Sequence, residues 1–141
     1  TQYTINQASM AQFTAITANG GTRSSSGTLA NYGAYTGVPI MTLLNYVGGV
    51  TSSNSAKVTA SDNYTNTYTY QQLTGEGVAT YDSTGSAVTP TQPLTMIVAW
   101  YLNSTALASN TGPLRTMYVG SEGLYSSGNM NAKMTIKIEI L

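Results

Sequence analysis

The sequence predicts a predominantly β protein of the α+β class, with two or three short helices, folded as a single domain over residues 1–141. Three observations lead to this prediction. Residues 94–102 form a nearly unbroken apolar run rich in β-branched and aromatic side chains, which is typical of a strand buried on both faces. Residues 134–140 alternate apolar and polar side chains, as a half-buried strand does. Residues 39–48 carry the clearest helical spacing.

The first third of the chain predicts short elements joined by turns. Asn6 can cap a helix that ends near Phe13, because its side chain can accept a hydrogen bond from a first-turn N–H. Asn19-Gly20-Gly21 has the composition of a turn and predicts the end of a strand. The strands expected in this region are residues 3–5, 14–18 and 27–35, the last two as hairpin partners.

The second helix is expected after Gly37-Val38. Pro39 suits a first helical turn, and Gly48 stands where a left-handed residue commonly ends a helix. The apolar residues between them form one helical face: Ile40, Leu43, Leu44 and Val47. Beyond this helix we expect strands at 56–60, 65–70, 77–81, 87–89, 94–102, 114–119 and 134–140, one helical turn at 71–73, and irregular chain over 120–131.

The charge content is far below that of an ordinary domain. Charged residues make up 7% of the chain, and the five basic and five acidic residues cancel, whereas about 25% is usual. So little repulsion favours association between copies. Five scattered cations cannot follow a phosphate backbone, so the sequence argues against nucleic-acid binding. The apolar run at 94–102 is too short to insert into a membrane.

Hydroxyl and amide side chains take the place of charged ones, which indicates an extracellular or cell-surface protein. Two acceptor motifs for N-glycosylation begin at Asn63 and Asn103. A chain that begins with Thr1 is expected to be a mature or excised piece of a longer protein. The absence of cysteine and histidine removes disulfides, thiolate nucleophiles and imidazole chemistry.

No set of residues predicts catalysis, and we expect a non-catalytic protein without a cofactor or a bound metal. Asp62 and Asp82 sit in turn sequences, where aspartate bonds to local backbone, and no ligand spacing supports a calcium site built from them. A serine nucleophile would need a lysine base, and Lys133 and Lys137 are expected on the solvated face of the last strand. The eleven tyrosines suit sheet packing or, alternatively, an interface.

Several segments in order resemble the molybdopterin-binding domain of the sulfite-oxidase family. They are Gly37-Val38-Pro39-Ile40 with Leu43-Leu44, residues 58–64, the apolar strand followed by Asn103, and Gly112-Pro113-Leu114-Arg115. The resemblance covers roughly residues 3–141. It implies a similar fold: predominantly β, with mixed sheets and short helices.

The resemblance does not carry the family's activity across. Family members bind molybdenum through a cysteine upstream of the Gly-Val-Pro helix, whereas this chain reads Thr22-Arg23-Ser24-Ser25-Ser26-Gly27 and has no cysteine. The histidine and the basic cluster that hold the pterin phosphate are also missing. The resemblance therefore implies a scaffold that is kept and a vestigial cofactor cleft that would contain Arg23, Ser24, Ser25 and Arg115.

Two functions of different classes follow. The first is an extracellular structural protein that self-assembles as a subunit of a filament, sheath or surface layer. Its assembly strands would be the terminal ones, at sheet edges that can pair with another copy; burial of the last strand in its own sheet is the alternative. The assembly residues would be Tyr3, Ile5, Ile136, Ile138 and Ile140. The second function is a cell-surface module that binds a glycan or a small ligand in the vestigial cleft. An active molybdenum oxidoreductase ranks third, because the cysteine is missing.

Overall fold

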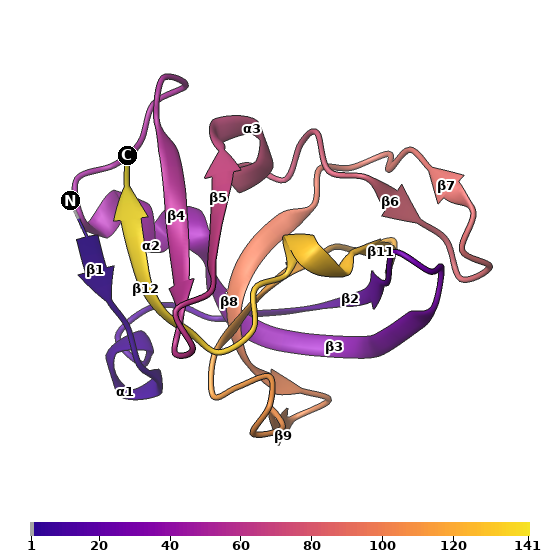
Figure 1. The fold of residues 1–141 in the computed structure, drawn as a ribbon, viewed down its shortest axis with the longest axis horizontal. Helices are drawn as coiled ribbons and strands as arrows, with labels where there is room; N and C mark the ends of the chain where they lie inside the picture. Colours follow the sequence, from indigo (N-terminus) through magenta and orange to yellow (C-terminus); the bar gives the residue numbers. More distant parts are fainter. Residues whose placement is uncertain (1) are drawn as a thin grey trace.

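The computed structural model describes residues 2–141 and, within them, every side chain except that of Tyr3. The protein is mostly β, with 44% strand and 13% helix, as the sequence predicts. Two sheets pack against each other: in Figure 1 the strands of the smaller sheet stand upright on the left, and β2 and β3 of the larger sheet cross beneath them. A hairpin of the larger sheet, β6–β7, projects on the right.

The smaller sheet is antiparallel throughout and the larger one is mixed. The smaller sheet has the order β1 (Gln2–Thr4), β12 (Thr135–Ile140), β4 (Ser55–Ala60) and β5 (Thr65–Thr69). The larger sheet has the order β10 (Arg115–Val119), β8 (Thr95–Leu102), β3 (Leu29–Pro39), β2 (Ile16–Arg23), β11 (Tyr125–Ser127), β6 (Thr80–Tyr81) and β7 (Ala87–Val88), with β9 (Thr105–Ala106) paired to β8. The parallel pair β11–β2 makes the larger sheet mixed.

Strand β8 is buried on both faces from Met96 to Ala99, as its apolar run predicts, whereas Tyr101 near its end is 37% exposed. Met96 and Val98 point into the main core between the two sheets, which they share with Val58 and Ile138 of the smaller sheet. The alternate residues of β8, Ile97 among them, belong to a second cluster on the opposite face of the larger sheet. Because side chains alternate across a strand, a continuous apolar run suits a strand with a core on each side.

Three short α-helices connect the strands. They are α1 (Gln7–Met10), α2 (Ile40–Tyr46) and α3 (Tyr70–Leu73), and a 3₁₀ turn covers Gly128–Met130. Asn6 caps α1 as predicted, with its Oδ1 accepting the Ser9 N–H at 2.9 Å. Helix α2 buries Ile40, Leu43 and Leu44 of its predicted apolar face, while Val47 is half-buried just after the helix ends at Tyr46. Gly48 follows with a positive φ as predicted, and the Gly49 N–H donates to Leu44 O at 2.8 Å.

The turn predicted at residues 19–21 is wrong, because β2 continues through them to Arg23. Gly20 is required for close packing rather than for a turn: a Cβ at this position would lie 2.4 Å from the Tyr118 carbonyl oxygen of β10. The expectation of an irregular segment over residues 120–131 is wrong in part, since β11 and the 3₁₀ turn lie there.

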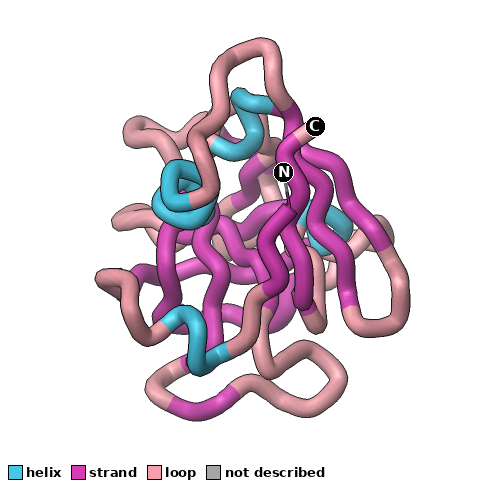
Figure 2. Tube along the Cα trace, turned by 90° about the vertical axis from the view of Figure 1, so that its left-hand side faces the viewer, coloured by secondary structure: helices cyan, strands magenta, loops and turns pink. Residues whose placement is uncertain are grey.

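The last strand does not lie at a sheet edge. Strand β12 runs between β1 and β4, so it is an inner strand of the smaller sheet and Ile138 pairs with Tyr3 on one side and with Val58 on the other. The assembly strand predicted to carry Ile136, Ile138 and Ile140 is therefore not an edge strand. A bulge between Thr135 and Lys137 also breaks the predicted alternation, leaving Ile136 40% exposed while Ile138 is buried. Figures 1 and 2 show the two chain ends side by side on the neighbouring strands β1 and β12.

The first strand, β1, does form an edge of the smaller sheet. Ile5, expected to take part in assembly, is buried at 3% exposure in the main core. The backbone of Tyr3 pairs with Ile138, and its side chain lies outside the described residues. Of the predicted assembly strands, only the first therefore presents an open edge within residues 2–141.

Candidate functional site

Arg23 and Arg115, both expected in the cleft, line a series of adjoining hollows at one end of the larger sheet. Three hollows, of about 250, 550 and 450 Å³, are linked by shared lining residues. Ser24 and Gly128 line the first two hollows, and Asn31, Arg115 and Lys133 line the first and the third. We call this depression the basic cleft; its defining residues are Arg23, Ser24, Asn31, Arg115, Gly128 and Lys133.

Arg115 is the most unusual residue of the basic cleft, because its charge is buried without a carboxylate. The residue begins β10 and is 2% exposed. Its Nε and Nη2 donate long hydrogen bonds to the carbonyl oxygens of Thr116 (3.4 Å) and Asn131 (3.3 Å). Neither of the two ion pairs found within residues 2–141 involves Arg115. Burial lowers the pKa of the Arg115 guanidinium, which is the response of a cation that has lost water and gained no anion.

Two phenols, those of Tyr35 and Tyr68, interact with the charge of Arg115. Tyr35 is fully buried, and its hydroxyl donates to Asn31 O at 2.5 Å. Burial raises the pKa of Tyr35, and the charge of Arg115 opposes that rise without reversing it. Burial likewise raises the pKa of Tyr68, the other phenol that senses Arg115. Both tyrosines therefore stay protonated near neutral pH and supply no counter-charge.

Arg23 adds a second cation, and one of its polar atoms has no hydrogen-bond partner among the described residues. Its guanidinium carbon lies 4.5 Å from the centroid of the Tyr81 ring, a cation–π contact between β2 and β6. The Arg23 Nε is the one buried side-chain polar atom among the described residues that lacks a hydrogen-bond partner. Ser24 and Ser25 share its hollow, and the Ser24 hydroxyl also accepts the Thr28 N–H at 3.0 Å.

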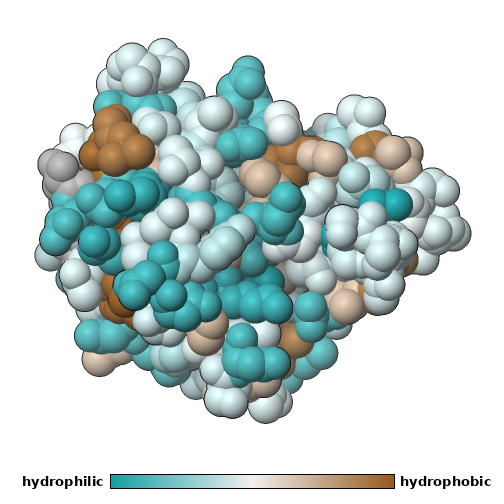
Figure 3. All heavy atoms as spheres, in the orientation of Figure 1, coloured by the Kyte–Doolittle hydropathy of each residue, from teal (hydrophilic) through white to brown (hydrophobic). Residues whose placement is uncertain are grey.

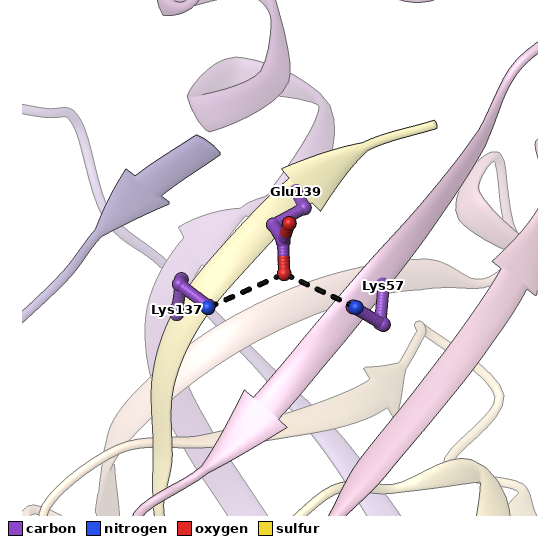
Figure 4. A network of polar contacts seen from close by, with 3 residues as sticks. All are labelled: Lys57, Lys137 and Glu139. Atoms are coloured by element: carbon purple, nitrogen blue, oxygen red, sulfur yellow. Dashed lines mark ion pairs between the residues drawn. The ribbon is translucent and has the colours of Figure 1, made fainter. Parts of the chain in front are cut away.

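Lys133 is the cleft residue that sequence reasoning missed. It was expected on the solvated face of the last strand beside Lys137, but it precedes β12 and lines two of the three hollows. Lys137 and Lys57 instead share one partner, the Glu139 Oε1, at 3.3 and 3.4 Å (Figure 4). These are the two ion pairs found within residues 2–141, so all three cations without a carboxylate partner lie in the basic cleft.

The acidic residues are engaged elsewhere. Among the described residues, no aspartate or glutamate lines any of the three hollows. Asp82 Oδ1 accepts the Thr84 N–H at 2.9 Å inside the β6–β7 turn. Glu122 Oε1 accepts the N–H groups of Thr91 and Gln92. No group of three histidine, cysteine, aspartate or glutamate residues within 2–141 is placed to hold a metal ion. The basic cleft is therefore positive and lined with hydroxyl, amide and phenol groups.

The residues present do not fit the cofactor that the resemblance implies. The segment from Thr22 to Gly27, where the family's metal-binding cysteine would stand, carries hydroxyl groups and Arg23, and the chain has no cysteine to supply a thiolate. No reaction step is therefore derived through a molybdenum cofactor. The chemistry that the basic cleft offers is charge and hydrogen-bond donation.

The two glycosylation motifs lie in different environments. Asn63 is exposed in the turn between β4 and β5, in the left-handed conformation that asparagine tolerates. The side-chain amide of Asn103 is used by the fold: its Oδ1 accepts the Ala34 N–H at 2.9 Å, and the amide packs directly against Gly33. Both asparagines are exposed, and they differ in that the Asn103 side chain is held by the backbone of β3.

Comparison with protein-family models and with curated proteins finds no match for this chain. In the described part of the chain, no helix combines the length and the apolar character needed to span a bilayer. The resemblance to the sulfite-oxidase family stays a prediction from the sequence.

Proposed function

We propose that this protein is a non-catalytic extracellular binding module that holds an oxyanion group of its ligand in the basic cleft. The observation that carries the proposal is Arg115, a buried guanidinium that makes two long hydrogen bonds to carbonyl oxygens and has no carboxylate partner within residues 2–141. A buried charge without a partner is unfavourable, and an anion in the cleft would compensate it. The planar guanidinium suits carboxylate, sulfate and phosphate groups alike.

The rest of the basic cleft supports a ligand larger than a single ion. Lys133 adds a second charge beside Arg115, and Arg23 adds a third in the linked hollow. The hydroxyl and amide groups between them, such as Ser24 and Asn31, suit the hydroxyl groups of a sugar. A small acidic metabolite or an acidic glycan therefore fits the charge and the polarity of the cleft.

Thermal unfolding in the presence of different anions tests this function. Sodium phosphate, sulfate, acetate and glucuronate are compared with sodium chloride at matched ionic strength. A ligand at a hundred times its Kd adds about 2.7 kcal/mol to the free energy of unfolding. With an unfolding entropy of about 2.1 cal/mol/K per residue, this raises the Tm by roughly 9 °C. The anion with the largest saturable shift identifies the ligand class.

The chain offers a matched pair of lysine variants as a control. Lys133→Gln removes a charge from the basic cleft, whereas Lys137→Gln removes one that is paired with Glu139. We expect the anion-dependent shift to shrink in Lys133→Gln and to persist in Lys137→Gln. Equal shifts in both variants, or shifts no larger than that of chloride, would show that the cleft binds no anion specifically.

A further inference from the structure

A second surface suggests how copies of the protein associate, and it does not depend on ligand binding. The smaller sheet has one edge at β1 and the other at β5. Neither strand carries a lysine, a proline or a bulge, three of the devices that protect an edge from pairing with another chain; β1 is three residues long and β5 five.

The edges of the larger sheet are treated differently. The outer edge of β10 is covered by the segment before β12: the Thr116 N–H donates to Ala132 O at 2.8 Å, and the Tyr118 N–H to Asn131 Oδ1 at 3.0 Å. At the other edge, β7 is two residues long. Because the fold covers or shortens these edges, the two open edges of the smaller sheet stand out.

The hydrogen-bond pattern identifies the backbone groups that each open edge presents. The Ala60 N–H donates to Tyr64 O, so these two residues form a hydrogen-bonded pair, and every second pair along β4 and β5 does the same. The N–H and C=O groups of Thr65 and Thr67, which lie between those pairs, therefore point away from β4. On β1 the Ile5 N–H donates to Ile136 O. By the same alternation, the backbone groups of Gln2 and Thr4 point away from β12.

The two edges match each other in spacing, direction and chemistry. Each presents two outward residues separated by one, since the N–H of Thr69, the third outward residue of β5, donates to Gln72 Oε1. The side chains of Gln2, Thr4, Thr65 and Thr67 are all exposed and uncharged. Strands β1 and β5 run antiparallel within one sheet, so a second copy placed beside the first extends it with antiparallel pairing throughout. Thr67 would then face Gln2 of the next copy and Thr65 would face Thr4 of the next copy, with two backbone bonds in each pair.

We propose that copies of this chain associate head to tail, with β5 of one copy pairing with β1 of the next in this register. The contact is heterologous, so it can repeat into an open filament. The face shown in Figure 3 supports backbone pairing over apolar docking, because hydrophobic residues appear there only as small, separate areas. The net charge of zero leaves no long-range repulsion against the contact.

Blocking one edge at a time tests the proposal by sedimentation velocity on the full chain. Thr67→Pro removes the outward N–H of β5, and Thr4→Pro removes that of β1, while neither removes a bond inside the sheet. We expect the wild type to form larger species as concentration rises, and each variant alone to stay monomeric. An equimolar mixture should give a dimer and nothing larger, because one open edge of each kind remains.

Control variants separate edge pairing from loss of folding. Thr67→Val keeps the backbone N–H and should assemble like the wild type. Thr67→Lys keeps both the N–H and the strand but adds a charge at the edge, and it replaces Thr67→Pro if that variant has a lower Tm. A monomeric wild type, self-association of Thr4→Pro alone through paired β5 edges, or a mixture that stays monomeric would each overturn the proposal. Anion binding in the basic cleft should be the same in all these variants.

Discussion

Replacing Arg115 with methionine tests whether this arginine binds a ligand or stabilises the fold. Methionine has a similar length and keeps the packing of the arginine stem, but it removes the charge and the donors. In the folded protein Arg115 is 2% exposed and makes two long hydrogen bonds, to Thr116 O and Asn131 O. The substitution therefore loses two weak hydrogen bonds and removes a buried charge that has no carboxylate partner.

The size of the effect follows from these two opposing terms. Two hydrogen bonds at the weak end of the usual range contribute about 1–2 kcal/mol together. Burying an ion without a partner costs several kcal/mol even after relaxation. We expect Arg115→Met to increase the free energy of unfolding by about 1–3 kcal/mol, which corresponds to a Tm higher by roughly 3–10 °C in a chain of this length.

Differential scanning calorimetry without and with phosphate measures both consequences. Without phosphate, the variant should unfold at a higher temperature than the wild type; with phosphate, its Tm should no longer rise. A Tm lower than the wild type by more than about 10 °C would indicate a loss of about 3 kcal/mol or more, as expected when a well-satisfied buried partner is removed. That result would refute the view that Arg115 is held ready for a ligand.

Three further predictions concern other parts of the molecule. Burial alone would raise the pKa of Glu139, but the hydrogen bonds and charges of Lys137 and Lys57 hold it below its ordinary value of 4.5. The folded state therefore gains stability from this carboxylate above about pH 4.5 and loses it as the pH falls further, so Glu139→Gln should flatten the acid side of a plot of Tm against pH. Expression in a glycosylating host should modify Asn63 and leave Asn103 bare, as peptide mass spectrometry would reveal; occupancy of Asn103 alone would contradict this. Gly75 has φ +86°, and a Cβ there would collide with the Leu94 backbone, so Gly75→Ala should lower the free energy of unfolding by at least about 2 kcal/mol in a urea titration.

The elements with a strong local pattern could be predicted from the sequence. The apolar run of β8 identifies a strand with a core on each side, and the spacing of Ile40, Leu43 and Leu44 identifies α2. In both cases the number and placement of apolar residues leave few alternatives. Asn6 and Gly48 then mark one start and one end of a helix through groups that satisfy free backbone bonds.

The elements that sequence reasoning misplaced depend on distant contacts. Asn19-Gly20-Gly21 has the composition of a turn, yet the glycine at position 20 is needed because the backbone of β10 approaches it. For β12 the sequence left open an edge position or burial in its own sheet, and burial holds because β1 pairs with its outer side. Neither neighbour is close in sequence, so no local pattern could reveal it.

The basic cleft, too, could be predicted only in part from the sequence. The resemblance pointed to Arg23 and Arg115, which do line linked hollows, but not to Lys133. Strand β12 begins at Thr135, so Lys133 lies before the strand and its side chain does not follow the alternation that places Lys137. A regular period of two in the sequence cannot signal where the strand begins. The lack of an acidic partner for Arg115 likewise becomes visible only in three dimensions.

The nitrogen-15 NMR spectrum of the arginine side chains tests anion binding in the basic cleft most directly. The chain has two arginines, Arg23 and Arg115, so the Nε–Hε region should contain two signals, one from each side of the cleft. During a phosphate titration at constant ionic strength, we predict that the Arg115 signal moves and reaches a plateau, and that it does not move with chloride. An Arg115 signal that stays in place, or that drifts without saturation, would contradict the proposed function.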